Sequence, residues 1–126
     1  MIDFKGYIIK HFAKFKVAHS IPGRIRLKVN NATKIPVEAR EYDKYVIQGV
    51  KILDGIENIE FNYLTGSVLI NYDINVVYEE KIIKWLNNVL DIVLQNMKLI
   101  QEYGETNIDY VVNTLEQKLK DAVKTL

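Results

Sequence analysis

Hydrophobic and polar positions alternate in three short stretches of the chain, which is the pattern of half-buried β-strands. In the first stretch three aliphatic residues alternate with three basic ones, namely Ile25, Leu27 and Val29 with Arg24, Arg26 and Lys28. Residues 58–63 and 67–72 alternate in the same way on either side of a short loop that contains Gly66. These last two stretches predict a β-hairpin.

Three other stretches repeat hydrophobic residues at intervals of three and four, which is the period of an α-helix. They run from about 37 to 53, from about 77 to 103 and from about 107 to the end of the chain. The last stretch carries a heptad-like seam that includes Leu115, Leu119 and Leu126. Such a seam suits self-association, and it equally suits antiparallel packing on the preceding helix.

The segment before residue 24 is less regular. Residues 1–14 favour a short amphipathic helix over a strand, because their hydrophobic residues fall at helical spacing. Residues 15–18 indicate a short strand that leads into the turn at Pro22-Gly23, so this strand and residues 24–29 could be one strand broken by a bulge.

The order of these elements predicts an α+β fold with a ferredoxin-like split βαβ core, in which helices cover one face of the sheet. We expect a βαββα order with additional C-terminal helices, and with the usual fourth strand missing or replaced, because residues 95–103 look helical. The sheet edge beside residues 24–29 then needs cover from the N-terminal segment, the extra helices or another subunit. The expected organisation is a single domain, 1–126, with a core at about 15–94, an N-terminal extension at 1–14 and a C-terminal helical extension at 95–126.

Composition narrows the classes of function. The 126 residues carry a formal net charge of +1, so electrostatic binding would need a local basic patch. The chain has no cysteine, which excludes disulfides, thiolate metal sites and cysteine nucleophiles. No apolar run reaches the roughly 18 residues of a membrane span, and no signal pattern is evident. We therefore expect a cytoplasmic protein.

Two motifs carry a resemblance to a known family. The stretch GIENIEFNYLTGSVLINYD, residues 55–73, resembles the second half of heavy-metal-associated domains, which have an Asn-x-x-Thr-Gly-Ser-Val run across their hairpin. The opening HSIPGRIRLKV resembles a divergent branch in which His-x-x-Pro-Gly-Arg precedes the first core strand. The likeness covers roughly residues 15–94, and it implies the fold and a role near metal or haem handling.

This chain departs from the family at the metal loop. The usual family binds soft metals through a Met-x-Cys-x-x-Cys loop between the first strand and the first helix. Here that loop is NNATKIP, residues 30–36, which has no cysteine, histidine, methionine or carboxylate. Because nothing in this loop replaces the thiolates, the resemblance carries metal binding over to none of its residues.

The remaining candidate ligand-binding residues lie close to the Pro22-Gly23 turn in the sequence. The candidate ligand-binding residues are His19, Ser20, Gly23, Arg24 and Arg26. The imidazole of His19 could ligate a metal or haem iron, or it could be an ordinary surface histidine. Backbone N–H groups at the turn, together with a guanidinium, could hold an anion such as a haem propionate, or the turn could be purely structural.

Other classes of function find less support. Arg24, Arg26 and Lys28, with Lys14 and Lys16, form a basic strip, but RNA binding by a sheet needs exposed aromatic residues on the same face. The aromatic residues of the predicted hairpin alternate with the polar ones and should face the helices, so no nucleic-acid partner is expected. The sequence shows no catalytic motif.

The first hypothesis is therefore a non-enzymatic accessory module in metal or haem homeostasis, which binds a small anionic or metal ligand near His19. The second is a structural or protein-interaction module, a homo-oligomer or a partner of another protein. It would dimerise or dock through its sheet edge and its C-terminal helix. The third and least supported hypothesis is RNA binding by the basic face of the sheet.

Overall fold

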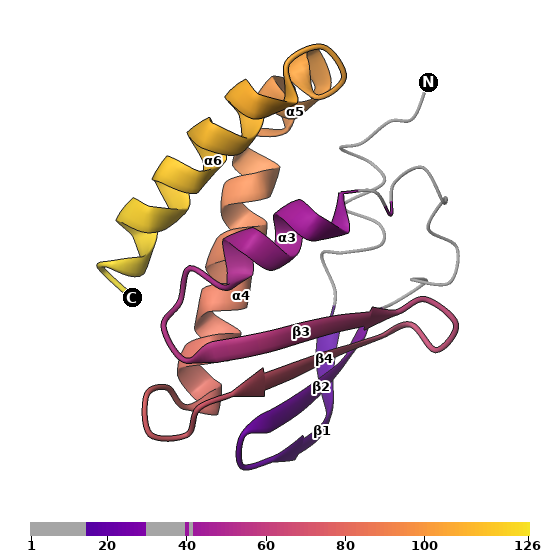
Figure 1. Ribbon diagram of the computed structural model, residues 1–126, viewed down its shortest axis with the longest axis vertical. Helices are drawn as coiled ribbons and strands as arrows, with labels where there is room; N and C mark the ends of the chain where they lie inside the picture. Colours follow the sequence, from indigo (N-terminus) through magenta and orange to yellow (C-terminus); the bar gives the residue numbers. More distant parts are fainter. Residues whose placement is uncertain (1–14, 30–39, 41) are drawn as a thin grey trace.

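Figure 1 shows the computed structural model of the chain, of which residues 15–29, 40 and 42–126 are described. Antiparallel strands form one sheet, and they are β1 (Phe15–Ile21), β2 (Arg24–Val29), β3 (Ile56–Asn62) and β4 (Ser67–Tyr72). The helices in the described part of the chain are α3 (Asp43–Val50), α4 (Glu79–Gln95), α5 (Met97–Tyr103) and α6 (Ile108–Val123). The α+β class and the additional C-terminal helices are confirmed.

Within the described residues the sheet has four strands in the order β1-β2-β4-β3, so the prediction of a missing fourth strand is wrong. The strand β1 takes the place beside β2 that the sequence left open, and it comes from the N-terminal side of the core. Gly23 has a φ of 84° in the turn between the two strands, which lets the chain reverse. Residues 15–21 therefore form their own strand and are not the start of β2.

The sequence indicated only the first part of β1, residues 15–18, because the strand does not alternate. Only Phe15 is partly buried, and the other residues of β1 are exposed. The register with β2 also shifts between Val17 and His19, so the bulge lies within β1 and not between two halves of one strand. A bulge interrupts the period of two that reveals a strand in a sequence.

The described helices lie within the predicted helical stretches, but their limits differ and one stretch is divided. The long stretch from 77 to 103 forms two helices, because α4 ends before Asn96. The side-chain amide of Asn96 donates a hydrogen bond of 2.7 Å to the carbonyl of Ile92, which competes with the regular helical pattern. The prediction for residues 1–14, and residues 37–39 of the first predicted helix, lie outside the described residues.

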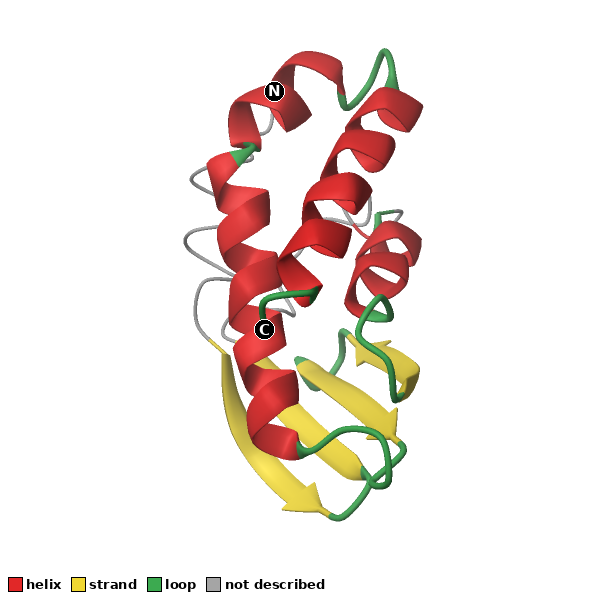
Figure 2. Ribbon diagram, turned by 90° about the vertical axis from the view of Figure 1, so that its left-hand side faces the viewer, coloured by secondary structure: helices red, strands yellow, loops and turns green. Residues whose placement is uncertain are grey.

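Figure 2 shows the helices gathered on one side of the sheet, as predicted. Between the sheet and the helices lies a core whose largest fully buried side chains are Trp85, Ile25, Ile70 and Ile82. The strand β2 confirms the alternation that the sequence predicted, because its aliphatic residues are buried and its basic residues are exposed. The face of the sheet away from the helices, called the open face below, is polar over most of its area.

The C-terminal seam packs within the chain. The helix α6 contacts both α4 and α3, and Leu119 is buried at 5% exposure. The contact with α3 is so close that a Cβ added at Gly49 would lie 3.0 Å from Leu119 Cδ1. The packing of this residue thus follows the antiparallel, intramolecular alternative.

Replacing Leu119 with alanine should lower the free energy of unfolding by about 2–4 kcal/mol, because the variant leaves a cavity between α6 and α3. Urea unfolding followed by circular dichroism measures the loss, and light scattering measures the mass. We expect the mass to equal that of the unsubstituted protein. A change in mass at unaltered stability would contradict this packing and would place Leu119 between subunits.

Candidate functional site

The register of the first hairpin decides which face each candidate residue occupies, since residues directly opposite each other in an antiparallel pair share a face. His19 lies opposite Arg26, and Ser20 lies opposite Ile25. Arg26 is exposed on the open face, whereas Ile25 is fully buried against the helices. His19 therefore lies on the open face, and Ser20 lies on the helix side.

The other candidates divide in the same way. Arg24 shares the open face with His19 and Arg26, because it alternates with buried neighbours along β2. Gly23 lies in the turn, where its carbonyl accepts a hydrogen bond of 3.0 Å from the Tyr72 N–H. The five predicted residues thus form no single pocket. Three of them, His19, Arg24 and Arg26, form a patch that we call the open-face cluster.

The polar groups of the open-face cluster are available to bind a ligand. Among the described residues, neither guanidinium nor the imidazole of His19 has a hydrogen-bond or ion-pair partner. The neighbours on the next strand are Asn71, opposite Arg24, and Leu69, opposite Arg26. The cluster therefore joins two fixed positive charges, one imidazole and an aliphatic side chain on one surface, which suits an anion with an apolar body.

The open face lacks a platform for stacking nucleic-acid bases within the described strands. Phe61 lies opposite Val68, and both pack against the buried core on the helix side. Tyr63 donates a hydrogen bond of 2.5 Å to Asp43 of α3. The aromatic side chains of β3 and its end thus lie where the alternation predicted, while the absence of RNA binding itself stays a prediction.

No preformed metal site accompanies His19 in the described part of the chain. No group of three histidine, cysteine, aspartate or glutamate residues lies close enough there to hold a metal ion. A single imidazole is too few ligands for a bare Zn²⁺, which takes four in most protein sites. His19 as a metal ligand remains a prediction, and the loop at residues 30–36 lies outside the described residues.

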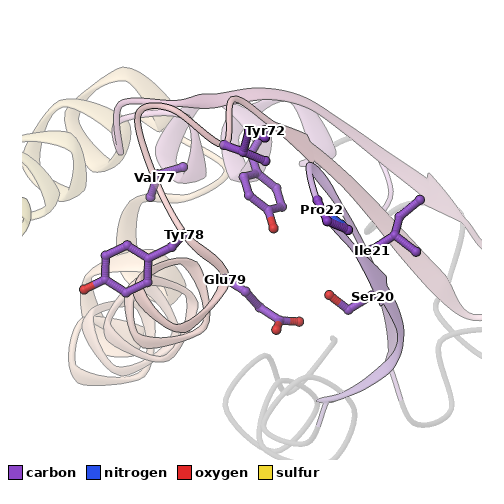
Figure 3. Close-up of a pocket in the computed structure, with 8 residues that line it drawn as sticks. Ser20, Ile21, Pro22, Tyr72, Val77, Tyr78 and Glu79 are labelled. Atoms are coloured by element: carbon purple, nitrogen blue, oxygen red, sulfur yellow. The ribbon is translucent and has the colours of Figure 1, made fainter.

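A second feature, which the sequence pattern did not predict, lies on the helix side of the same turn. An open pocket of about 320 Å³ separates the end of β1 from the start of α4 (Figure 3). Its lining combines the end of β1 and the turn with the end of β4, the β4–α4 connection and the start of α4, namely Ser20, Ile21, Pro22, Tyr72, Ile74, Val77, Tyr78 and Glu79. Ser20 is the candidate residue that lines it. Tyr72 and Glu79 were missed, because only the pairing of β2 with β4 brings them near the turn.

A polar cluster at the other end of the sheet joins β3 to α3. The Arg40 guanidinium lies 4.3 Å from the centre of the Tyr63 ring, and the Tyr63 hydroxyl donates to Asp43. Burial raises the pKa of the Asp43 carboxyl, and the hydrogen bond from Tyr63 and the charge of Arg40 partly oppose that rise. This cluster joins β3 to the start of α3 and lies at the opposite end of the sheet from the Pro22-Gly23 turn.

One of the comparisons with known proteins identifies the family of the chain. The sequence model of a family described as heavy metal associated domain 2 matches residues 1–126. No curated protein and no solved structure matches the chain. None of the helices in the described part is long and apolar enough to cross a membrane. Since the match covers the whole sequence, the chain belongs to the heavy metal associated domain 2 family, as a member without cysteine.

Proposed function

We propose that this protein is a non-enzymatic accessory module of metal or haem handling, and that its ligand is haem bound on the open face of the sheet. The observation that carries the proposal is the register of the first hairpin, which sets His19 directly opposite Arg26. Residues paired in this way have Cβ atoms about 4.5–5.5 Å apart. An imidazole and a guanidinium then reach the same ligand.

The chemistry of the open-face cluster supports haem over a bare metal ion. A neutral imidazole is a common axial ligand of haem iron. The guanidiniums of Arg24 and Arg26 suit the two propionates, since arginine binds carboxylates through paired hydrogen bonds. Leu69, half-buried beside Arg26, offers apolar contact to the ring. A bare ion would use only the imidazole of this set.

Titration with haem, followed by the visible absorption spectrum, tests the proposal. We expect saturable binding to the full chain and a loss of affinity of at least about tenfold in His19→Ala, because the axial ligand is removed. His11→Ala is the matched control, since His11 is the only other histidine of the sequence. Equal titration curves for the protein and for His19→Ala would overturn the assignment of His19.

The second candidate function is a protein-interaction module that dimerises or docks on a partner. The observation that favours it is a group of exposed hydrophobic residues in the β4–α4 connection: Ile74, Val76 and Tyr78. Clustered apolar surface is typical of interaction sites. Absence of saturable haem binding together with a dimeric mass in light scattering would favour this function over haem handling.

A further inference from the structure

A tyrosine hydroxyl without a described partner faces the pocket beside the first hairpin. Tyr72 is only 7% exposed, and Figure 3 shows its hydroxyl directed into the pocket. No hydrogen bond joins this hydroxyl to another described residue. A phenolic hydroxyl can both donate and accept a hydrogen bond. The Tyr72 hydroxyl is therefore available to a ligand in this pocket.

Two further oxygen groups point into the same space. Figure 3 shows the Glu79 carboxylate and the Ser20 side chain directed toward each other across the pocket. Glu79 is half-buried at the first position of α4, where the helix N-terminus favours a negative charge. Both ion pairs found among the described residues lie within the last helix and its end, so neither neutralises Glu79.

The walls of the pocket are apolar. Pro22 and Val77 line it beside the polar groups, and Ile74 lies at its exposed side. A volume of about 320 Å³ is at the lower limit for small-molecule sites, which begin near 300 Å³. The pocket thus suits a short apolar stem that ends in a group attracted by one carboxylate and two hydroxyls.

A primary ammonium group fits this set of acceptors. It has three N–H donors and no acceptor, and the pocket offers Glu79, Tyr72 and Ser20 as three oxygen acceptors. A bare divalent cation fits poorly, because calcium takes six to eight oxygen ligands and is usually held by several carboxylates. An anion is repelled by Glu79, and a neutral alcohol leaves the carboxylate without a charged partner.

We propose that the pocket between β1 and the start of α4 binds a small primary alkylammonium, with Glu79 as the counter-ion and the hydroxyls of Tyr72 and Ser20 as further acceptors. This site lies on the helix side of the sheet. It is separate from the open-face cluster and does not depend on haem binding.

Titration of the full chain with hexylammonium in phosphate buffer, followed by amide chemical shifts in NMR, tests the proposal. We expect saturable shifts at the amides of Ser20, Gly23 and Glu79. Hexanol and hexanoate have the same stem with a neutral and an anionic end, and each should bind at least about tenfold more weakly, because the charge-assisted hydrogen bonds are absent. Absence of saturable shifts with hexylammonium, or equal binding of hexanol, would overturn the proposal.

Two variants assign the binding to the pocket. Glu79→Gln keeps the shape of the side chain and should weaken hexylammonium binding at least about tenfold. The matched control is Glu80→Gln, which removes the same charge from the next residue, an exposed one that does not line the pocket. Tyr72→Phe keeps the buried ring and should weaken binding to a smaller extent. If Glu80→Gln weakens binding as much as Glu79→Gln, the attraction is non-specific and the site is wrong.

Discussion

Replacing Trp85 with alanine should lower the free energy of unfolding by about 3–5 kcal/mol, a large share of the 5–15 kcal/mol that is typical of a domain. Trp85 is fully buried in the middle of the core. Its indole N–H also donates a hydrogen bond of 2.9 Å to the carbonyl of Val50, the last residue of α3. The alanine variant loses the packing of the ring and leaves this carbonyl with only the longer hydrogen bond, of 3.4 Å, from the Leu53 N–H.

Urea unfolding should be followed by circular dichroism, because Trp85 is the only tryptophan of the sequence and its fluorescence is lost with it. Trp85→Phe keeps much of the ring and removes the donor, so it should show an intermediate loss of about 1–3 kcal/mol. Leu64→Ala is the surface control, since Leu64 is 92% exposed and its truncation should change stability by less than about 0.5 kcal/mol. A loss below about 1 kcal/mol in Trp85→Ala would contradict the described core.

Replacing Gly55 with alanine should lower the free energy of unfolding by about 2–5 kcal/mol, from two separate causes. Gly55 has a φ of 100°, a conformation that disfavours residues with a Cβ by about 1–2 kcal/mol. An added Cβ would also lie 2.6 Å from Val77 Cγ1, and crowding of this kind costs about 1–3 kcal/mol. Val77 is itself buried, so it has little room to move away.

Gly23→Ala separates the two causes. Gly23 also has a positive φ, of 84°, but the nearest atom to an added Cβ is the Tyr72 carbonyl oxygen at 3.3 Å. This variant should lose about 1–2 kcal/mol, mainly from the backbone conformation. Urea unfolding of both variants gives the comparison. If Gly55→Ala loses no more than Gly23→Ala, the contact with Val77 is not limiting.

Much of the fold could be predicted from the sequence because several elements have one face in the core and one in water. The strand β2 and the β3–β4 hairpin show this directly, and Ile25 and Ile70 are almost fully buried on the side that the alternation assigned. The strand β1 has almost no buried face and carries a bulge. It is held mainly by backbone pairing, which leaves little trace in the order of side chains.

The candidate site could be predicted only in part, for a related reason. The motif at the turn drew attention to residues 19–26, but a shift of one residue moves a side chain to the other face of a sheet. The register shift after Val17 places His19 with Arg26 and sends Ser20 to the pocket on the helix side. Tyr72 and Glu79 meet this segment only through tertiary structure.

The position of β1 has a consequence for folding. In a βαββαβ chain the last strand pairs with the first strand at the edge of the sheet. The two ends of such a chain must therefore come together before this pair can form. Here β1 and β2 are joined by a tight turn, and β2 with β4 is the one pairing of the described sheet that spans a long stretch of chain. Closing a short loop loses less chain entropy than closing a long one, and local contacts are associated with fast folding. The first hairpin therefore offers a template that can form before the helices dock on it.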